Sequence, residues 1–148
     1  MRKRRYAFCL VALLTALSAV GCASASRVTY IPEGASYTAE SLAEALEASD
    51  AGSAADVTTE EAPDVRQAAL ADLRSHGDEA ARLADVLTSE FPAGVAAVPY
   101  SVERGSYEDQ DAWIVFEAWG DEGGTLSNRR VWVFANDDLA VLAAQSAR

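Results

Sequence analysis

The C-terminal half of the chain contains two short segments that are apolar on both faces when they are read as β-strands. They are residues 112–119 (AWIVFEAW) and residues 129–135 (RRVWVFA). Successive side chains of a strand point to opposite faces, so a sheet with one face in water shows a polar residue at every second position. Glu117 is the single charged residue between Trp113 and Trp119. The fold therefore has to cover both faces of the sheet at these strands.

Four consecutive segments of this half have strand character. Residues 98–102 alternate apolar with small or polar side chains, and residues 139–144 (LAVLAA) follow a turn at 136–138. Loops at 105–111 and 120–128, which are acidic or rich in glycine, separate the remaining strands. Consecutive strands with short connections predict an antiparallel meander.

In the segment before these strands, apolar residues recur at the spacing expected of two amphipathic helices. The first is expected to begin near Asp64, three residues before a glutamine that completes a capping pattern, and to end at Gly77. The second is expected to begin at Asp78 and to stop before Pro92. Their apolar positions are Val65, Ala69 and Leu73, then Leu83, Leu87 and Phe91. The sequence predicts an α+β domain over residues 63–148, a helical hairpin packed on a three- to four-stranded antiparallel β-meander.

Residues 22–62 are rich in Ala, Ser, Thr, Gly and Glu and contain few large apolar side chains. Such a composition buries too little apolar surface to offset the entropy of ordering the chain. We expect an acidic, low-complexity tether. One short helix is expected near residues 41–48, where Ser41 and Glu44 form a capping pattern ahead of two leucines one helical turn apart.

The N-terminus has the organisation of a secretory signal peptide. Residues 2–6 (RKRRY) are basic, and residues 7–20 (AFCLVALLTALSAV) are apolar. This apolar stretch is shorter than the roughly 20 residues that a membrane-spanning helix needs, and it fits the central region of a signal peptide.

The apolar stretch ends in Ala19-Val20-Gly21-Cys22. This motif resembles the lipobox of bacterial lipoproteins, although Ala19 stands where that family prefers leucine. The resemblance implies cleavage after residues 1–21, a diacylglyceryl thioether on Cys22 and commonly acylation of the new amine, typically by palmitate. Two or more acyl chains give stable attachment. The expected location is the extracytoplasmic face of the cell membrane.

Two other outcomes stay open at the same site. Ala23-Ser24-Ala25 fits an ordinary signal peptidase, which would release a soluble, secreted protein beginning at Ser26. An uncleaved anchor is the third alternative. The position of Cys22 directly after a glycine at the end of the apolar stretch favours the lipobox. Because Cys9 would leave with the signal peptide, the mature chain would have no disulfide and no free thiol.

The charge of the chain excludes one class of partner. The formal charge is −11, and loss of residues 1–21 removes four basic side chains and no acidic one, which leaves about −15. Nucleic acids bind proteins through Lys and Arg that neutralise phosphates. We therefore expect no nucleic-acid partner.

Familiar catalytic motifs are missing from the sequence. His76 is the only histidine, and its place beside Gly77 fits a cation at a helix C-terminus. Neither G-x-S-x-G nor H-E-x-x-H occurs. The acidic loops at Glu108–Asp111, Asp121–Glu122 and Asp137–Asp138 could offer oxygen ligands to calcium, but none has EF-hand spacing. We expect no catalytic residues, no metal site and no cofactor.

The aromatic residues of the two strands are the remaining candidates for a binding surface. Trp113, Trp119, Trp132 and Phe134 are expected either to form a ligand or partner face or to lie in the core. The N-terminal segment, a second subunit or a ligand would cover the second face of the sheet. The sequence favours a membrane-anchored envelope lipoprotein with a small noncatalytic domain that binds a protein or an envelope component. The alternative is an extracytoplasmic enzyme, or enzyme subunit, of unfamiliar type.

Overall fold

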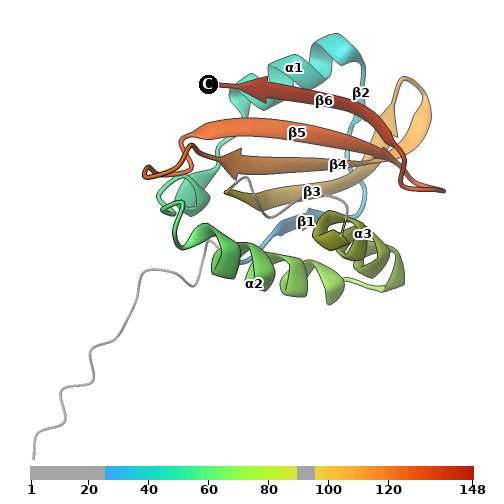
Figure 1. Ribbon diagram of the computed structural model, residues 1–148. Coiled ribbons are helices and arrows are strands. Elements are labelled where there is room, and N and C mark those ends of the chain that lie inside the picture. Colours follow the sequence, from blue (N-terminus) through green and yellow to red (C-terminus); the bar gives the residue numbers. More distant parts are fainter. Residues whose placement is uncertain (1–25, 90–95) are drawn as a thin grey trace, which may run out of the picture.

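The computed structural model describes residues 26–89 and 96–148, which form one sheet with helices on both faces (Figure 1). The sheet has six strands in the order β1-β3-β4-β5-β6, and β2 pairs with β3 along the same edge as β1. The strands are β1 (Thr29–Ile31), β2 (Ser36–Tyr37), β3 (Ala97–Tyr107), β4 (Gln110–Trp119), β5 (Asn128–Ala135) and β6 (Val141–Ala147). The helices are α1 (Ala39–Ala48), the 3₁₀ turn η1 (Gly52–Ala54), α2 (Ala62–Arg74) and α3 (Asp78–Ser89).

The fold class is α+β, but the expectation of a purely antiparallel meander is wrong. Strands β3 to β6 do pair antiparallel in chain order, whereas β1 and β2 both run parallel to β3. Strand β3 continues through residues 105–107, where an acidic loop was expected. Its tight turn lies at Glu108 and Asp109, which both have positive φ. The added length of β3 gives β2 an edge on which to pair, at Ser106 and Tyr107, whereas β1 pairs with residues 101–103.

A close approach of two backbones secures this parallel edge. The Gly34 N–H donates a hydrogen bond of 2.7 Å to the Arg104 carbonyl. A Cβ at Gly105 would collide with the carbonyl of Ala35. Glycine is therefore required at position 105, because only a residue without a side chain leaves room for the segment that leads into β2.

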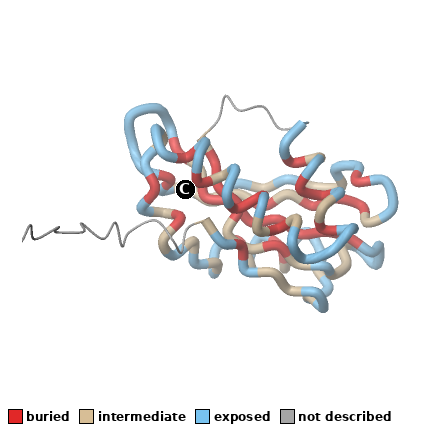
Figure 2. The backbone as a smooth tube through the Cα atoms, turned by 90° about the horizontal axis from the view of Figure 1, so that it is seen from below, coloured by how far each residue is buried: buried red, intermediate tan, exposed pale blue. Residues whose placement is uncertain are grey.

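Both faces of the sheet are covered, as the two apolar strands require. Every residue from Ala112 to Ala118 on β4 is buried, and Figure 2 shows the buried strands between exposed outer surfaces. Helices α2 and α3 pack on one face, where Leu73 and Leu83 join the core around Trp113. Helix α1 covers the other face with Leu42 and Leu46. The side chains that these two leucines meet are Ala112, Ile114, Phe116, Val131 and Val133.

The part of residues 22–62 that the structure describes is folded, contrary to the expected tether. It supplies β1, β2, α1 and η1, and Val28, Leu42 and Leu46 are buried. The helix expected near residues 41–48 is α1, but its cap is Thr38, whose hydroxyl accepts a hydrogen bond from the Ser41 N–H. Composition underestimated how much of this segment would be ordered. Two buried leucines and two short strands are enough to fix it in place because β3 already provides a sheet edge on which it can pair.

The helical hairpin forms close to its expected limits. Helix α2 begins at Ala62, two residues before Asp64, and α3 begins at Asp78. Phe91 and Pro92 lie outside the described residues, as do the predicted signal peptide, Cys22 and the Ala23-Ser24-Ala25 site. Within residues 26–89 and 96–148, none of the helices combines the length and the apolar character that crossing a bilayer demands.

Candidate functional site: a cleft between α1 and the β1–β3 edge

The structure separates the four aromatic residues that were expected to share a binding face. Trp113 and Phe134 are 1% and 0% exposed and lie in the core beneath α2 and α3. Trp119 and Trp132 are partly exposed. Burial therefore excludes Trp113 and Phe134 from contact with a ligand or partner, since the hairpin already occupies the face to which they belong.

Glu117, the acidic residue of the apolar strand β4, is buried between two arginines. Its Oε1 accepts a hydrogen bond of 2.6 Å from Arg66 on α2, and its Oε2 accepts one of 2.7 Å from Arg130 on β5. The indole N–H of Trp132 donates to the same Oε2 at 3.1 Å. Burial alone would raise the pKa of Glu117, but the two guanidinium groups outweigh it and hold that pKa below 4.5. This cluster ties the hairpin to the sheet.

The contacts of His76, the sole histidine, connect β1 to the end of α2. The ring of His76 stacks on Tyr30, with 4.4 Å between the ring centroids. Its Nε2 lies 3.8 Å from a carboxylate oxygen of Asp72, and that oxygen also accepts a hydrogen bond from the Val28 N–H. His76 thus helps to hold β1 against the end of α2.

The acidic loops of the meander do not converge on a cation site. Asp109, Asp111 and Asp137 line a cavity of about 420 Å³ at one end of the sheet. Across the described residues, no group of three or more His, Cys, Asp or Glu side chains is placed to hold a metal ion.

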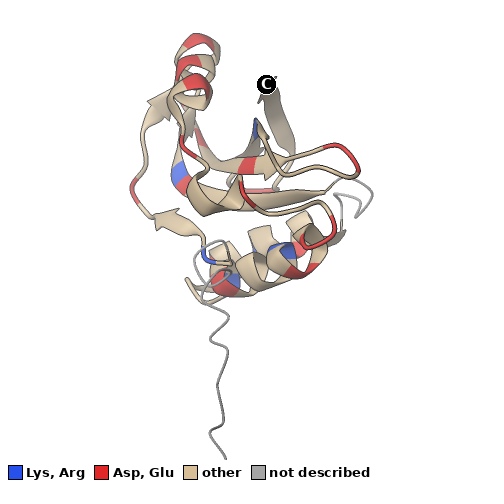
Figure 3. Cartoon of the chain, turned by 90° about the vertical axis from the view of Figure 1, so that its left-hand side faces the viewer, with Lys and Arg blue, Asp and Glu red and all other residues tan. Residues whose placement is uncertain are grey.

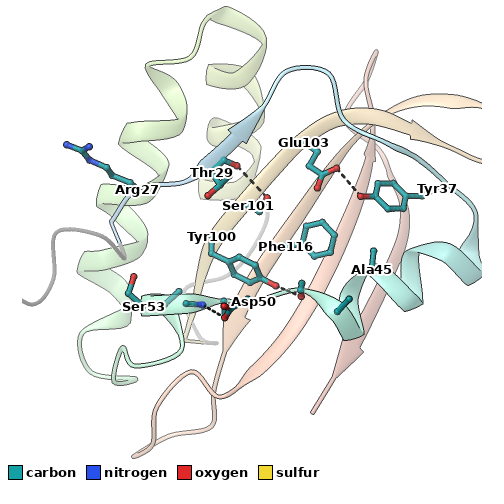
Figure 4. Close-up of a pocket in the computed structure, with 15 residues that line it drawn as sticks. Arg27, Thr29, Tyr37, Ala45, Asp50, Ser53, Tyr100, Ser101, Glu103 and Phe116 are labelled. Atoms are coloured by element: carbon teal, nitrogen blue, oxygen red, sulfur yellow. Dashed lines mark hydrogen bonds between the residues drawn. The ribbon is translucent and has the colours of Figure 1, made fainter.

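A larger cleft, of about 480 Å³, lies between α1, η1 and the edge formed by β1 and β3 (Figure 4). It opens on the face of the sheet that α1 covers. Its lining comes from segments far apart in the sequence: Arg27, Thr29, Tyr37, Ala45, Ala48, Ser49, Asp50, Ala51, Gly52, Ser53, Ala54, Tyr100, Ser101, Glu103 and Phe116.

Three aromatic rings form the walls of the cleft. Tyr100 and Phe116 lie side by side, with ring centroids 6.2 Å apart. The Tyr100 hydroxyl is hydrogen-bonded to the Ser49 hydroxyl at 2.7 Å, which fixes the end of α1 against β3. On the opposite side, the Tyr37 hydroxyl donates to Glu103 Oε2 at 3.0 Å. Hydrogen bonds therefore hold the two tyrosine rings in place, while Phe116, which is 3% exposed, is held by packing in the core beneath α1.

Both tyrosines remain protonated well above neutral pH. Burial, followed by the negative charge of Glu103 and the hydrogen bond to it, raises the pKa of Tyr37 to about 12. Burial also raises the pKa of Tyr100. These phenols can donate hydrogen bonds to a ligand or to their present partners, but they do not exchange protons as catalytic bases near neutral pH.

Comparisons with known proteins do not assign a function to the chain, so the assignment depends on the geometry of the site. No protein-family model, no curated protein and no solved structure matches the chain. Sequence reasoning had not selected Tyr37, Tyr100 or Glu103. Tyr37 lay in the expected tether, and only the parallel pairing of β2 with β3 brings it to Glu103.

Proposed function

We propose that this protein is a lipid-anchored component of a bacterial cell envelope whose domain binds a small ligand in the cleft between α1 and the β1–β3 edge. The observation that supports it most is the cleft itself. A concave site of about 480 Å³ with three aromatic walls and a few fixed polar groups has the size and composition of ligand sites in proteins.

The binding is proposed to be noncatalytic because the polar pairs of the cleft are suited to holding rather than to transferring protons. Tyr37 is engaged with Glu103, and Tyr100 with Ser49. Both phenols have a raised pKa. A general base acting near neutral pH needs a pKa close to that pH.

The proposed anchor would keep the cleft near the membrane. Arg27, at the rim of the cleft, is five residues after Cys22. A fully extended chain spans at most about 3.6 Å per residue, so the rim would stay within about 18 Å of the lipidated cysteine. A ligand at or near the membrane surface would be within reach of the site.

Metabolic labelling with an alkyne analogue of palmitate tests the anchor. The full chain, expressed in a bacterial host, should take up the label and sediment with membranes. Cys22→Ser should lose the label, with Cys9→Ser as the matched control that keeps it. Label retained by Cys22→Ser would refute the lipobox assignment.

A fragment screen tests the cleft. The isotope-labelled full chain in nonionic detergent micelles is titrated with small amphipathic fragments while backbone ¹H–¹⁵N shifts are recorded. We expect the largest changes at the lining residues of the cleft. Changes gathered instead around Trp119 and Trp132 would move the binding surface to the other face of the sheet and overturn the proposal.

A further inference from the structure

One half-buried carboxylate of the cleft retains hydrogen-bonding capacity toward the cavity. Glu103 Oε2 accepts the Tyr37 hydroxyl at 3.0 Å, and no hydrogen bond to its Oε1 is found among the described residues. Neither Glu103 nor Asp50 takes part in any of the ion pairs within residues 26–89 and 96–148. A partly desolvated carboxylate without a cation interacts favourably with a positive ligand group.

The positive groups nearby are directed elsewhere. In Figure 4 the guanidinium of Arg27 points away from the cavity. Arg129, close to the end of α1, donates to the backbone carbonyls of Glu47 and Ser49. Asp50 accepts a hydrogen bond from the Gly52 N–H, so its charge stays at the rim. The negative charge of the cleft is therefore concentrated at the wall formed by Tyr37 and Glu103, whereas at Tyr100 the charge of Arg129 outweighs that of Asp50.

The surroundings strengthen this negative field. Figure 3 shows acidic residues along α1, which forms one wall of the cleft, and the chain as a whole carries a formal charge of −11. The pKa of Tyr37, raised to about 12 by burial and by the charge of Glu103, agrees with a negative potential at this wall. An anionic ligand would be repelled, whereas a cation would be attracted.

The aromatic walls suit the same kind of ligand. An ammonium or guanidinium group is attracted to the face of an aromatic ring within about 6 Å of its centroid. Tyr100 lines the same cleft as Glu103 and is partly exposed, whereas Phe116 is only 3% exposed and supports the Tyr100 ring from behind, with 6.2 Å between the ring centroids. One ligand group can thus meet the carboxylate while its apolar part lies on the Tyr100 ring.

We propose that the cleft selects organic cations, with an ammonium group paired to Glu103 and an adjoining apolar or planar group packed on Tyr100. This inference rests on the proposed binding function of the cleft and adds the charge of the ligand and the residue that reads it.

Three probes of equal size and different charge test the inference. Benzylamine, benzyl alcohol and benzoate are titrated into the labelled full chain in nonionic micelles at neutral pH, and affinities are taken from the shifts of cleft residues. Benzylamine should bind about tenfold more tightly than benzyl alcohol, the gain expected of a charge-assisted hydrogen bond. Benzoate should bind more weakly than the alcohol. This comparison needs no variant.

Two variants then identify the residue. Glu103→Gln should lower the affinity for benzylamine to that for benzyl alcohol, while Glu122→Gln makes the same change of charge in an exposed loop outside the cleft and should leave both affinities unchanged. Tyr37→Phe keeps the carboxylate and removes its present donor, so benzylamine should bind at least as tightly as to the wild type.

The outcomes separate this inference from the proposed function. Equal affinities of benzylamine and benzyl alcohol, with shifts in the cleft, would refute the selection of cations and leave the binding cleft standing. An absence of cleft shifts with all three probes would overturn both. An equal effect of Glu103→Gln and Glu122→Gln would attribute the preference to net charge and reject the role of Glu103.

Discussion

Arg66 on α2 and Glu117 on β4 form an ion pair with 2.6 Å between Nη1 and Oε1, and the Glu117 side chain is only 1% exposed. Arg66 also donates to the backbone carbonyls of Ala97 and Leu87. One guanidinium thus connects α2, the end of α3 and the first residue of β3. The buried charge of Glu117 is tolerated because Arg130 supplies a second cation.

This geometry predicts a large effect of Arg66→Met on stability. The substitution removes one of the two cations of a buried carboxylate and two hydrogen bonds to backbone carbonyls, and should lower the free energy of unfolding by about 3 to 5 kcal/mol. Arg74→Met is the matched control on the same helix. The Arg74–Asp85 pair is exposed, at 38% and 70%, so its loss should cost less than about 1 kcal/mol. Urea unfolding measures both, and equal losses would contradict a buried role for Arg66.

The low pKa of Glu117 makes part of the stability depend on pH. Its pKa in the fold lies below the ordinary value of 4.5, so the folded state binds its proton less tightly than the unfolded state does. The contribution is complete above about pH 5 and is lost as the pH falls below the ordinary value and through the folded pKa. Glu117→Gln should therefore show a shallower loss of unfolding free energy between pH 5 and pH 3, as a urea series at several pH values will show. A parallel loss in wild type and variant would assign the acid sensitivity to other groups.

The ionisation of Tyr37 reports on the cleft. Its pKa of about 12, against an ordinary value of 10.0, follows from burial first and the charge of Glu103 second. Stability linked to this proton is complete below pH 10 and is lost as the pH rises through 12. The absorbance of phenolate, taken as the difference between wild type and Tyr37→Phe, should appear near pH 12. Glu103→Gln should move that midpoint toward 10 but not to it, because burial remains. A midpoint at 10 in the wild type would contradict the buried position of Tyr37.

Helix α1 should contribute to stability as a part of the core. Leu42 is 0% exposed and packs on the second face of the sheet. Leu42→Ala should lower the free energy of unfolding by about 2 to 5 kcal/mol. Glu44→Ala, at an exposed position of the same helix, should change it by less than about 0.5 kcal/mol. If both variants were as stable as the wild type by urea unfolding, α1 would be dispensable, and the tether expected from composition would be restored.

The elements whose pattern is local were predicted well from the sequence. Strand β4 (Gln110–Trp119) and β5 (Asn128–Ala135) begin or end within two residues of the expected segments, and α2 and α3 form the expected hairpin. Alternation and helical period are properties of neighbouring residues, so they can be read without knowing the fold. The requirement that both faces of the sheet be covered followed from the same pattern.

The parallel edge and the candidate site were not predictable in this way. Strands β1 and β2 have three and two residues, too few for an alternating pattern to stand out. They exist as strands because β3 offers an unpaired edge and Gly105 admits the neighbouring backbone. Tyr37 and Glu103 meet only through that pairing, although they are far apart in the sequence.

The sequence by itself determined that the second half is a sheet with two apolar faces, that a helical hairpin precedes it, and that the N-terminus has a signal-peptide pattern ending at Cys22. Tertiary structure decided which segment covers each face, and so buried Trp113 and left a cleft beside α1. The physical reason is that periodicity records which side chains share a face. What packs on that face depends on contacts between segments distant in the chain, and no local pattern contains them.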